Sequence, residues 1–231
     1  MDHTDPSACQ RCGACCRKGG PALHAQDLPL FGTEGPLGLA DVVTLRAGEL
    51  AHDQVQGRIA PLAGEMLKLR GREGSWTCRF YHHATRACAL YQDRPAECRL
   101  LNCRDTAALA DMYASQRLTR ADLLPPGHPV LLLLGEHEGL VPAACIPELG
   151  LALRAGDGTS HSAAEELVRM ALADEAFRRN LRDRAGIGLE YHDFFFGRGA
   201  GALFAAAGVT LRADARNGLR VQSDPLWRSA Q

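Results

Sequence analysis

Eight of the nine cysteines fall into two clusters, and this clustering restricts the fold more than any other feature of the sequence. Four lie within residues 9–16 in a C-x2-C-x2-C-C pattern, and four lie within residues 78–103 in a C-x9-C-x9-C-x4-C pattern. The clustered residues are Cys9, Cys12, Cys15, Cys16, Cys78, Cys88, Cys98 and Cys103. We read the two clusters as halves of one split eight-cysteine site.

The rest of the sequence indicates a reducing compartment, which decides how the thiols are interpreted. The N-terminus has no apolar core of a secretory signal, and the longest apolar run, Val130–Leu134, is far shorter than a membrane span. We therefore expect a cytoplasmic protein without membrane insertion. Clustered cysteines in a reducing compartment are typical of metal ligands or redox groups, and their odd number argues against a disulfide framework.

The spacing of the first cluster suits thiolate ligation of a metal. A C-x2-C step lets two thiolates reach one ion, and Gly13 allows the tight turn between two such steps. The run starts like a bacterial ferredoxin motif and departs from it at Cys16. Adjacent side chains usually diverge, so Cys15 and Cys16 are expected to serve two metals or two sides of one cluster, or one of them only packs. Eight cysteines suit two four-thiolate sites or one cluster with spare thiols.

Charge supports a thiolate site. Residues 9–18 hold three cations and no acid, and residues 76–104 have a net charge of +3, although the whole chain has a formal net charge of −1. A metal bound by four thiolates keeps negative charge, which nearby cations stabilise. The near-neutral total charge gives no reason to expect nucleic-acid binding.

The N-terminal half is predicted to contain loops and short strands around the cysteines. Strand-like segments occur at Val42–Arg46 and Met66–Arg70. Residues 76–91 predict a β-hairpin with its turn near His83–Arg86, which brings Cys78 and Cys88 together. Asp93 is then expected to cap a short helix that carries Cys98.

The C-terminal half is predicted to be mainly helical. Residues 162–184 have the clearest helical periodicity, with Ser162 as the expected N-cap and Gly186 as the stop. An aromatic core segment and a helix are expected over 194–209, and a hairpin with an Asn217–Gly218 turn over 209–223. We predict one α+β domain over residues 1–231, with a cysteine-cluster module at about 1–104 and helical cover at about 105–231.

The cysteine pattern resembles a known family, the CxxCxxCC cysteine-cluster proteins, also called the YkgJ family, a zinc- or iron-chelating domain. The resemblance rests on "CQRCGACCR" and on "TCRFYHHATRACALYQDRPAECRLLNC", and it includes the Y-x2-R-P-x2-C-R stretch. It implies that the eight clustered cysteines bind metal and that Tyr91, Arg94 and Arg99 lie next to the site. Some family members are similar to flagellin lysine methylases.

Three functions follow as hypotheses. The first is a protein that holds iron or an iron–sulfur cluster for redox, electron-transfer or partner-support work. The second is a structural zinc protein or interaction module. The third is a cluster-dependent enzyme related to flagellin lysine methylases, for which no catalytic residue is identified. A protein partner is compatible with the first two.

Other chemistry-bearing residues are interpreted as ordinary structural ones. Cys145 stands alone and is expected to be buried. His82 and His83 are expected to be solvated turn residues, with metal ligation as the alternative. The acid–histidine groups within 133–139 and 190–193 lack metal-site spacing and are expected to be exposed.

Overall fold

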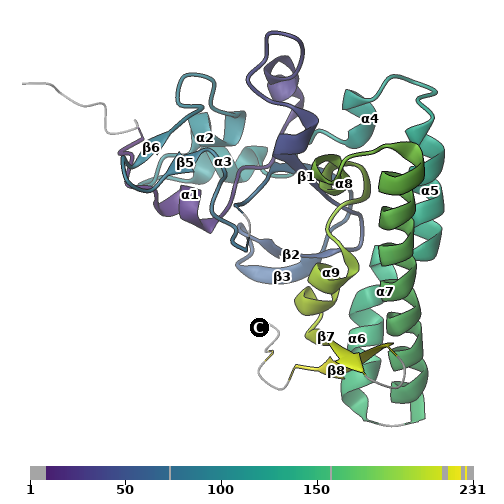
Figure 1. The fold of residues 1–231 in the computed structure, drawn as a ribbon. Helices are drawn as coiled ribbons and strands as arrows, with labels where there is room; N and C mark the ends of the chain where they lie inside the picture. Colours follow the sequence, from purple (N-terminus) through teal and green to yellow (C-terminus); the bar gives the residue numbers. More distant parts are fainter. Residues whose placement is uncertain (1–8, 73, 157, 215–217, 225–226, 228–231) are drawn as a thin grey trace, which may run out of the picture. The chain divides into compact units, whose positions relative to one another are not determined.

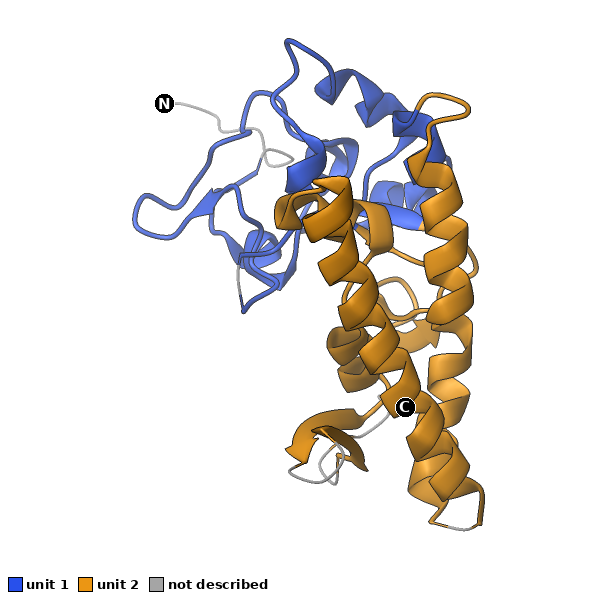
Figure 2. Ribbon diagram, turned by 45° about the vertical axis from the view of Figure 1, so that its right-hand side comes forward, with its two compact units in different colours: residues 1–43, 66–124 blue, residues 44–65, 125–231 orange. Residues whose placement is uncertain are grey.

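The computed structural model describes residues 9–72, 74–156, 158–214, 218–224 and 227. Helices and short antiparallel strand pairs together give the predicted α+β class (Figure 1). Two compact units divide the chain, and each is continuous with the other at three points (Figure 2). Unit 1 comprises residues 1–43 and 66–124, and unit 2 comprises residues 44–65 and 125–231. The single domain with a boundary near residue 104 stays a prediction.

Unit 1 is built around short strands that enclose a small apolar core. β1 (Val42–Leu45), through which the unit boundary passes, pairs with β4 (Met66–Leu69), and both match the predicted strand-like segments. The segment that follows the first cysteine cluster runs beside β4, because the Leu23 N–H donates to the Leu67 carbonyl at 2.9 Å. Buried apolar side chains fill the space between these pieces: Leu23, Val42, Val43, Leu67, Leu69 and Leu118.

The predicted cysteine hairpin is present and shorter than expected. β5 (Tyr81–His82) pairs antiparallel with β6 (Ala87–Cys88), and residues 83–86 form the turn. Tyr81 lies opposite Cys88 in this register. Cys78 precedes the hairpin and bridges to Gly71 instead of joining the strand.

Short helices complete unit 1. They are α1 (Ala14–Lys18), η1 (Ala25–Leu30), η2 (Leu39–Asp41), α2 (Ala96–Leu100), α3 (Ala107–Met112) and α4 (Arg120–Leu123). Cys98 lies on α2 as predicted, but the prediction that Asp93 caps this helix is wrong. Pro95 occupies the N-cap position, and the Asp27 carboxylate accepts from the Ala96 N–H at 2.8 Å. A distant carboxylate has taken the role that the local sequence gave to Asp93.

Unit 2 is mainly helical and carries two hairpins (Figure 1). The helices are α5 (Val130–Leu140), η3 (Ala143–Cys145), α6 (Ile146–Ala155), α7 (Gly158–Ala185), α8 (Leu189–Phe196) and α9 (Ala200–Ala206). The hairpins are β2 (Leu50–Asp53) with β3 (Arg58–Pro61), and β7 (Val209–Asp214) with β8 (Gly218–Ser223). The β7–β8 pairing confirms the predicted hairpin, although Asn217 lies outside the described residues.

The long helix α7 contacts most other elements of the unit 2 core. It begins at Gly158, four residues before the predicted cap Ser162, so Ser162 lies inside the helix. Gly186 follows its end with φ of +67°, as predicted. Its buried face packs with α6, α9 and the β7–β8 hairpin through Leu167, Met170, Phe204 and Val209. The aromatic core prediction is confirmed, since Phe194–Phe196 are buried, although they lie within α8.

One helical stretch is long and apolar enough to cross a membrane by length and composition. It runs over Val130–Ala155, through α5, η3 and α6, and only 28% of its most apolar part is buried. Core helices of soluble proteins pass the same criterion. Over the ranges that the structure describes, no second stretch of this kind occurs, so these residues show no multi-span membrane pattern.

Candidate metal centre

Six of the eight clustered cysteines lie close enough to act on one another electrostatically. Burial is the main cause that raises the pKa values of Cys78, Cys88 and Cys98, and the hydrogen bond with Cys15 is the main cause for Cys16. Charges on neighbouring thiols raise these pKa values further, and the acting thiols come from both clusters. The gathered set is Cys9, Cys15, Cys16, Cys78, Cys88 and Cys98. Cys12 and Cys103 are exposed, and neither is among the main influences on the gathered thiols. All nine cysteines are free of disulfides.

Cys15 and Cys16 converge, contrary to the expectation that adjacent side chains diverge. They lie in the first turn of α1, and their Sγ atoms are 3.9 Å apart. Two thiolates on one tetrahedral ion, each bound at about 2.3 Å, are separated by about 3.8 Å. The pair therefore has the spacing of one edge of a tetrahedral thiolate site.

The close contact shifts the pKa values of the two thiols in opposite directions. The hydrogen bond from the Cys16 thiol lowers the pKa of Cys15 to about 6, helped by the Arg17 charge and opposed by burial. The same hydrogen bond, together with burial, raises the pKa of Cys16 far above its ordinary value. The contact thus favours the thiolate form of one of the two sulfurs, which is the form that binds metal.

Cys78 and Cys88 sit in two copies of the same turn. The sequences are Cys-Arg-Phe-Tyr and Cys-Ala-Leu-Tyr, ten residues apart. In each turn the Tyr N–H donates to the Cys carbonyl, at 3.0 Å for Tyr81 and 3.2 Å for Tyr91. The N–H two residues after each cysteine donates to its sulfur and lowers the thiol pKa, although burial outweighs this and raises it. Backbone N–H donors to sulfur are a feature of thiolate metal sites.

The two tyrosines of these turns hold the first cysteine cluster in place. Gly13 has φ of +74°, and a Cβ atom there would overlap the hydroxyl and ring of buried Tyr81. Tyr91 lies between two guanidinium groups, with Arg11 at 4.0 Å and Arg94 at 4.1 Å from its ring centroid. The Cys78 N–H also donates to the Cys16 carbonyl at 2.8 Å. The two clusters are thereby joined by backbone and ring contacts.

A buried polar network fixes the helix that carries Cys98. Asp27 accepts from the His24 N–H at 3.0 Å and from the Ala96 N–H at the start of α2. Glu97, next to Cys98, accepts from the Ala22 N–H at 2.8 Å and lies 3.3 Å from His24 Nε2. His24 Nδ1 donates to a carbonyl at the end of the α3 segment, that of Ser115, at 2.7 Å. His24 and Asp27 are essentially unexposed, so this network is part of the unit 1 interior.

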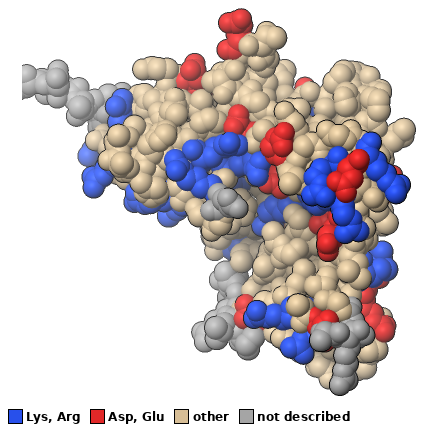
Figure 3. Space-filling view, in the orientation of Figure 1, with Lys and Arg blue, Asp and Glu red and all other residues tan. Residues whose placement is uncertain are grey.

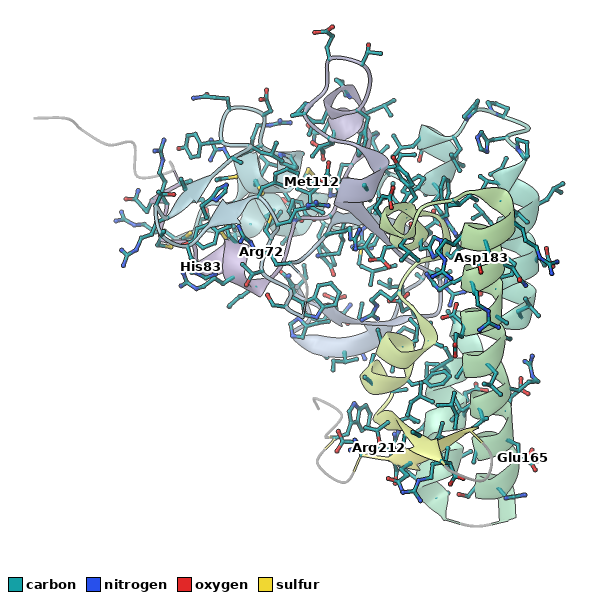
Figure 4. All side chains as sticks on the ribbon, viewed as in Figure 1. Arg72, His83, Met112, Glu165, Asp183 and Arg212 are labelled. Atoms are coloured by element: carbon teal, nitrogen blue, oxygen red, sulfur yellow. The ribbon has the colours of Figure 1, made fainter. Side chains whose placement is uncertain are left out.

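The other residues assigned to the site take supporting positions. Arg94 donates to the Tyr91 carbonyl at 2.9 Å, and its charge lowers the Cys88 thiol pKa against the larger effect of burial. Arg99 donates to the Arg94 carbonyl and lies 3.8 Å from Asp27. His82 and His83 are exposed, as expected, and the His83 ring packs against the Tyr81 ring. Figure 4 shows Arg72 and His83 on the cysteine-rich side of unit 1.

The gathered thiols do not form a completed ligand set. Within the residues that the structure describes, no three His, Cys, Asp or Glu side chains are arranged to hold a metal ion as they stand. The donor chemistry nevertheless fits a metal that prefers thiolates, because sulfurs, N–H donors and cations occur together.

The comparisons with known proteins agree with this donor set. Residues 8–115 match the family model CxxCxxCC, described as "Putative zinc- or iron-chelating domain". The matched segment, just under half of the chain, is thus similar to this family. The match confirms the resemblance found in the cysteine pattern and supports metal binding, without deciding the metal. No curated protein and no solved structure matches the chain.

Sequence reasoning missed the contacts within residues 8–115 that join distant parts of the chain. His24 and Glu97 meet across 73 residues, and Asp27 reaches the Ala96 N–H across 69. In the sequence, only His24 and Asp27 within the stretch "ALHAQDL" pointed to a buried polar network. The repeated C-x2-Y spacing was a visible signal for the paired turns, since both tyrosines contact the first cluster.

Three expectations about unit 2 are wrong. Cys145 is exposed, because it lies in η3 at the surface and not in the core. His137 is buried, and its Nε2 is 2.7 Å from the Asp174 carboxylate. His192 is buried as well, next to the Ile187 carbonyl at 3.1 Å. These histidines are held by long-range or main-chain partners that local spacing does not reveal.

Proposed function

We propose that residues 8–115 hold iron, as iron or as an iron–sulfur cluster, through the gathered cysteine thiolates. The observation that carries the proposal is the number of thiols: six interact, and one tetrahedral ion takes four. Cys9, Cys15, Cys16, Cys78, Cys88 and Cys98 would supply the ligands. Thiolate-bound iron changes its oxidation state by one electron, which is the chemistry that the bound group would supply.

Exposure of the thiols favours a redox or electron-transfer role over an enclosed structural one. Cys9, Cys15, Cys16 and Cys88 are all partly exposed, so a metal held there lies near the molecular surface. Solvent exposure, N–H donors to sulfur and nearby charge are the features by which a protein sets the reduction potential of such a centre. The charges of Arg17 and Arg94 act on Cys15 and Cys88.

A structural zinc site is the second candidate, and the Cys15–Cys16 pair favours it. The 3.9 Å separation of these sulfurs suits two ligands of one tetrahedral ion, which is the usual geometry of structural zinc. Zinc would then contribute folding energy to unit 1 directly.

Metal and acid-labile sulfide analysis of anaerobically purified protein separates the candidates. The iron proposal expects stoichiometric iron with visible thiolate-to-iron absorption, and inorganic sulfide if a cluster is present. Stoichiometric zinc in a colourless, sulfide-free protein would overturn it in favour of structural zinc. The Cys145→Ser variant is the matched control and is expected to keep the full metal content, because Cys145 lies in unit 2, outside the gathered set.

We also propose that the protein is cytoplasmic and that the metal centre works with an acidic protein partner. Figure 3 shows a group of Lys and Arg atoms on unit 1. Arg11, Arg17, Lys18 and Arg86 are exposed and form no ion pair among the described residues. Arg11 and Arg86 have φ of +52° and +51°, a conformation that costs an arginine energy, which suggests that their side chains are needed there.

The partner proposal is tested by cross-linking in cell extracts and by salt titration of any complex found. Association that weakens in Lys18→Gln/Arg86→Gln, and not in Arg212→Gln/Arg220→Gln on the β7–β8 hairpin, supports it. Binding of duplex DNA with the same dependence on these residues contradicts it. Fractionation that places the protein in membranes contradicts the location.

A further inference from the structure

Unit 2 contains a pocket of about 610 Å³ that no part of the metal proposal uses. Its volume lies within the range of ordinary small-molecule sites. One wall is α7, and the others are the start of α8, the start of α9 and the β7–β8 hairpin. The lining residues that matter are Asp174, Glu175, Arg178, Arg179, Arg182, Leu189, Leu211 and Leu219.

The pocket's most buried acid is already neutralised by the protein. Asp174 Oδ1 accepts from His137 Nε2 at 2.7 Å and from Arg178 Nε at 2.8 Å, and its Oδ2 accepts from the Ala200 N–H at 2.8 Å. These partners hold the pKa of Asp174 well below its usual range, against the effect of burial. Arg178 is further fixed by donating to the Gly197 carbonyl at 3.0 Å. Asp174 and Arg178 are therefore paired with each other and with the surrounding protein, and neither charge is left for a ligand.

Two guanidinium groups in the same pocket remain available to a ligand. Arg179 lies 3.6 Å from Glu175 and Arg182 lies 2.8 Å from Asp183, and all four side chains are at least half exposed. Exposed pairs of this kind contribute little to stability, so an anion can replace the carboxylate partner at small cost. Figure 3 shows cationic and acidic atoms close together over α7, on which Asp183 is labelled in Figure 4.

The rest of the lining is apolar and incompletely covered. Leu189 is 58% exposed although it lines the pocket, and Leu211 and Leu219 face it from the hairpin. A ligand with a short hydrocarbon body would remove this apolar surface from water. Because arginines line one wall and leucines line the others, the pocket favours a molecule that has both a negative charge and a hydrocarbon body.

We propose that this pocket binds a small amphipathic carboxylate, with its anionic head at Arg179 and Arg182 and its hydrocarbon chain against Leu189, Leu211 and Leu219. The site lies wholly within unit 2 and is independent of the metal centre. Arginine recognises a planar carboxylate through two parallel N–H donors, which gives the head group its place.

Calorimetric titration of the full chain with octanoate tests the proposal, with acetate and 1-octanol as partial probes. We expect saturable octanoate binding and much weaker binding of acetate, which lacks the chain, and of 1-octanol, which lacks the charge. Arg179→Gln/Arg182→Gln should weaken octanoate binding about tenfold. The matched control Arg169→Gln/Arg184→Gln, with the same charge change on the same helix, should leave it within about twofold.

Two results would overturn the proposal. One is the absence of saturable octanoate binding to the wild-type chain. The other is an equal loss of affinity in the two double variants, which would assign the effect to overall charge. Circular dichroism establishes that each variant keeps its helices, and Leu211→Asn provides a second test, since it should weaken octanoate binding and leave acetate unchanged.

Discussion

Replacement of Gly13 by alanine tests how the first cysteine cluster is held. Gly13 has φ of +74°, a left-handed conformation that costs an L-residue about 1–2 kcal/mol. A Cβ atom would also overlap the hydroxyl and ring of Tyr81, which is 2% exposed and cannot swing into water without losing its packing. Overpacking of this kind costs about 1–3 kcal/mol. The two costs together predict that Gly13→Ala lowers the free energy of unfolding of unit 1 by about 2–5 kcal/mol.

Gly74 provides the matched control, because it shares the backbone conformation without the contact. Its φ is +71°, and a Cβ atom there meets nothing within 4 Å. Gly74→Ala should therefore cost only the backbone part, about 1–2 kcal/mol. Urea unfolding followed by tryptophan fluorescence, to which Trp76 in unit 1 contributes, measures both variants. Equal destabilisation of the two variants would refute the packing of Gly13 against Tyr81.

Three further perturbations have defined outcomes. Asp27→Ala removes the acceptor of two buried N–H groups and should lower the free energy of unfolding of unit 1 by about 2–5 kcal/mol in urea. A loss below about 1 kcal/mol would show that the Asp27 network contributes little to stability. Burial lowers the pKa of His137, so the unfolded chain takes up a proton more readily, and stability should fall as pH drops below about 6.5. His137→Gln should reduce the fall of the melting temperature between pH 7 and 5. An equal fall in the variant and the wild-type chain would contradict the assignment of this pH dependence to His137. Cys15→Ser should lower metal affinity at least tenfold in competition with a chelator, and a loss of the same size in Cys145→Ser would argue against the gathered set.

Local pattern was sufficient for the elements whose structure depends on neighbouring residues. The aromatic runs around His83–Arg86 predicted the β5–β6 hairpin, and the helical periodicity of residues 162–184 predicted most of α7. The cysteine spacing led to the prediction of one split eight-cysteine site, and six of the eight thiols act on one another in the structure, while metal binding by all eight stays a prediction. These are cases in which local sequence and global fold require the same structure.

Contacts between distant residues were beyond the same reasoning. Asp93 has the residue type and the position that favour an N-cap. The N–H at the start of α2 is instead bonded by the carboxylate of Asp27, which is far away in sequence. Adjacent cysteines were expected to diverge, yet the rotamers adopted in α1 bring Cys15 and Cys16 sulfurs to 3.9 Å. His137 was taken for an exposed residue because its partner Asp174 lies on another helix. Side-chain direction and tertiary partners, which spacing does not encode, decided each of these.

The central claim is that sulfurs from both cysteine clusters bind the same metal centre. X-ray absorption spectroscopy of the metal-loaded full chain, at the edge of whichever metal is found, tests it most directly. The account predicts an all-sulfur first coordination sphere at about 2.3 Å, which loses sulfur when either Cys15 or Cys98 is changed to serine. A sphere made mainly of nitrogen or oxygen, or one that either substitution leaves unchanged, would contradict the claim.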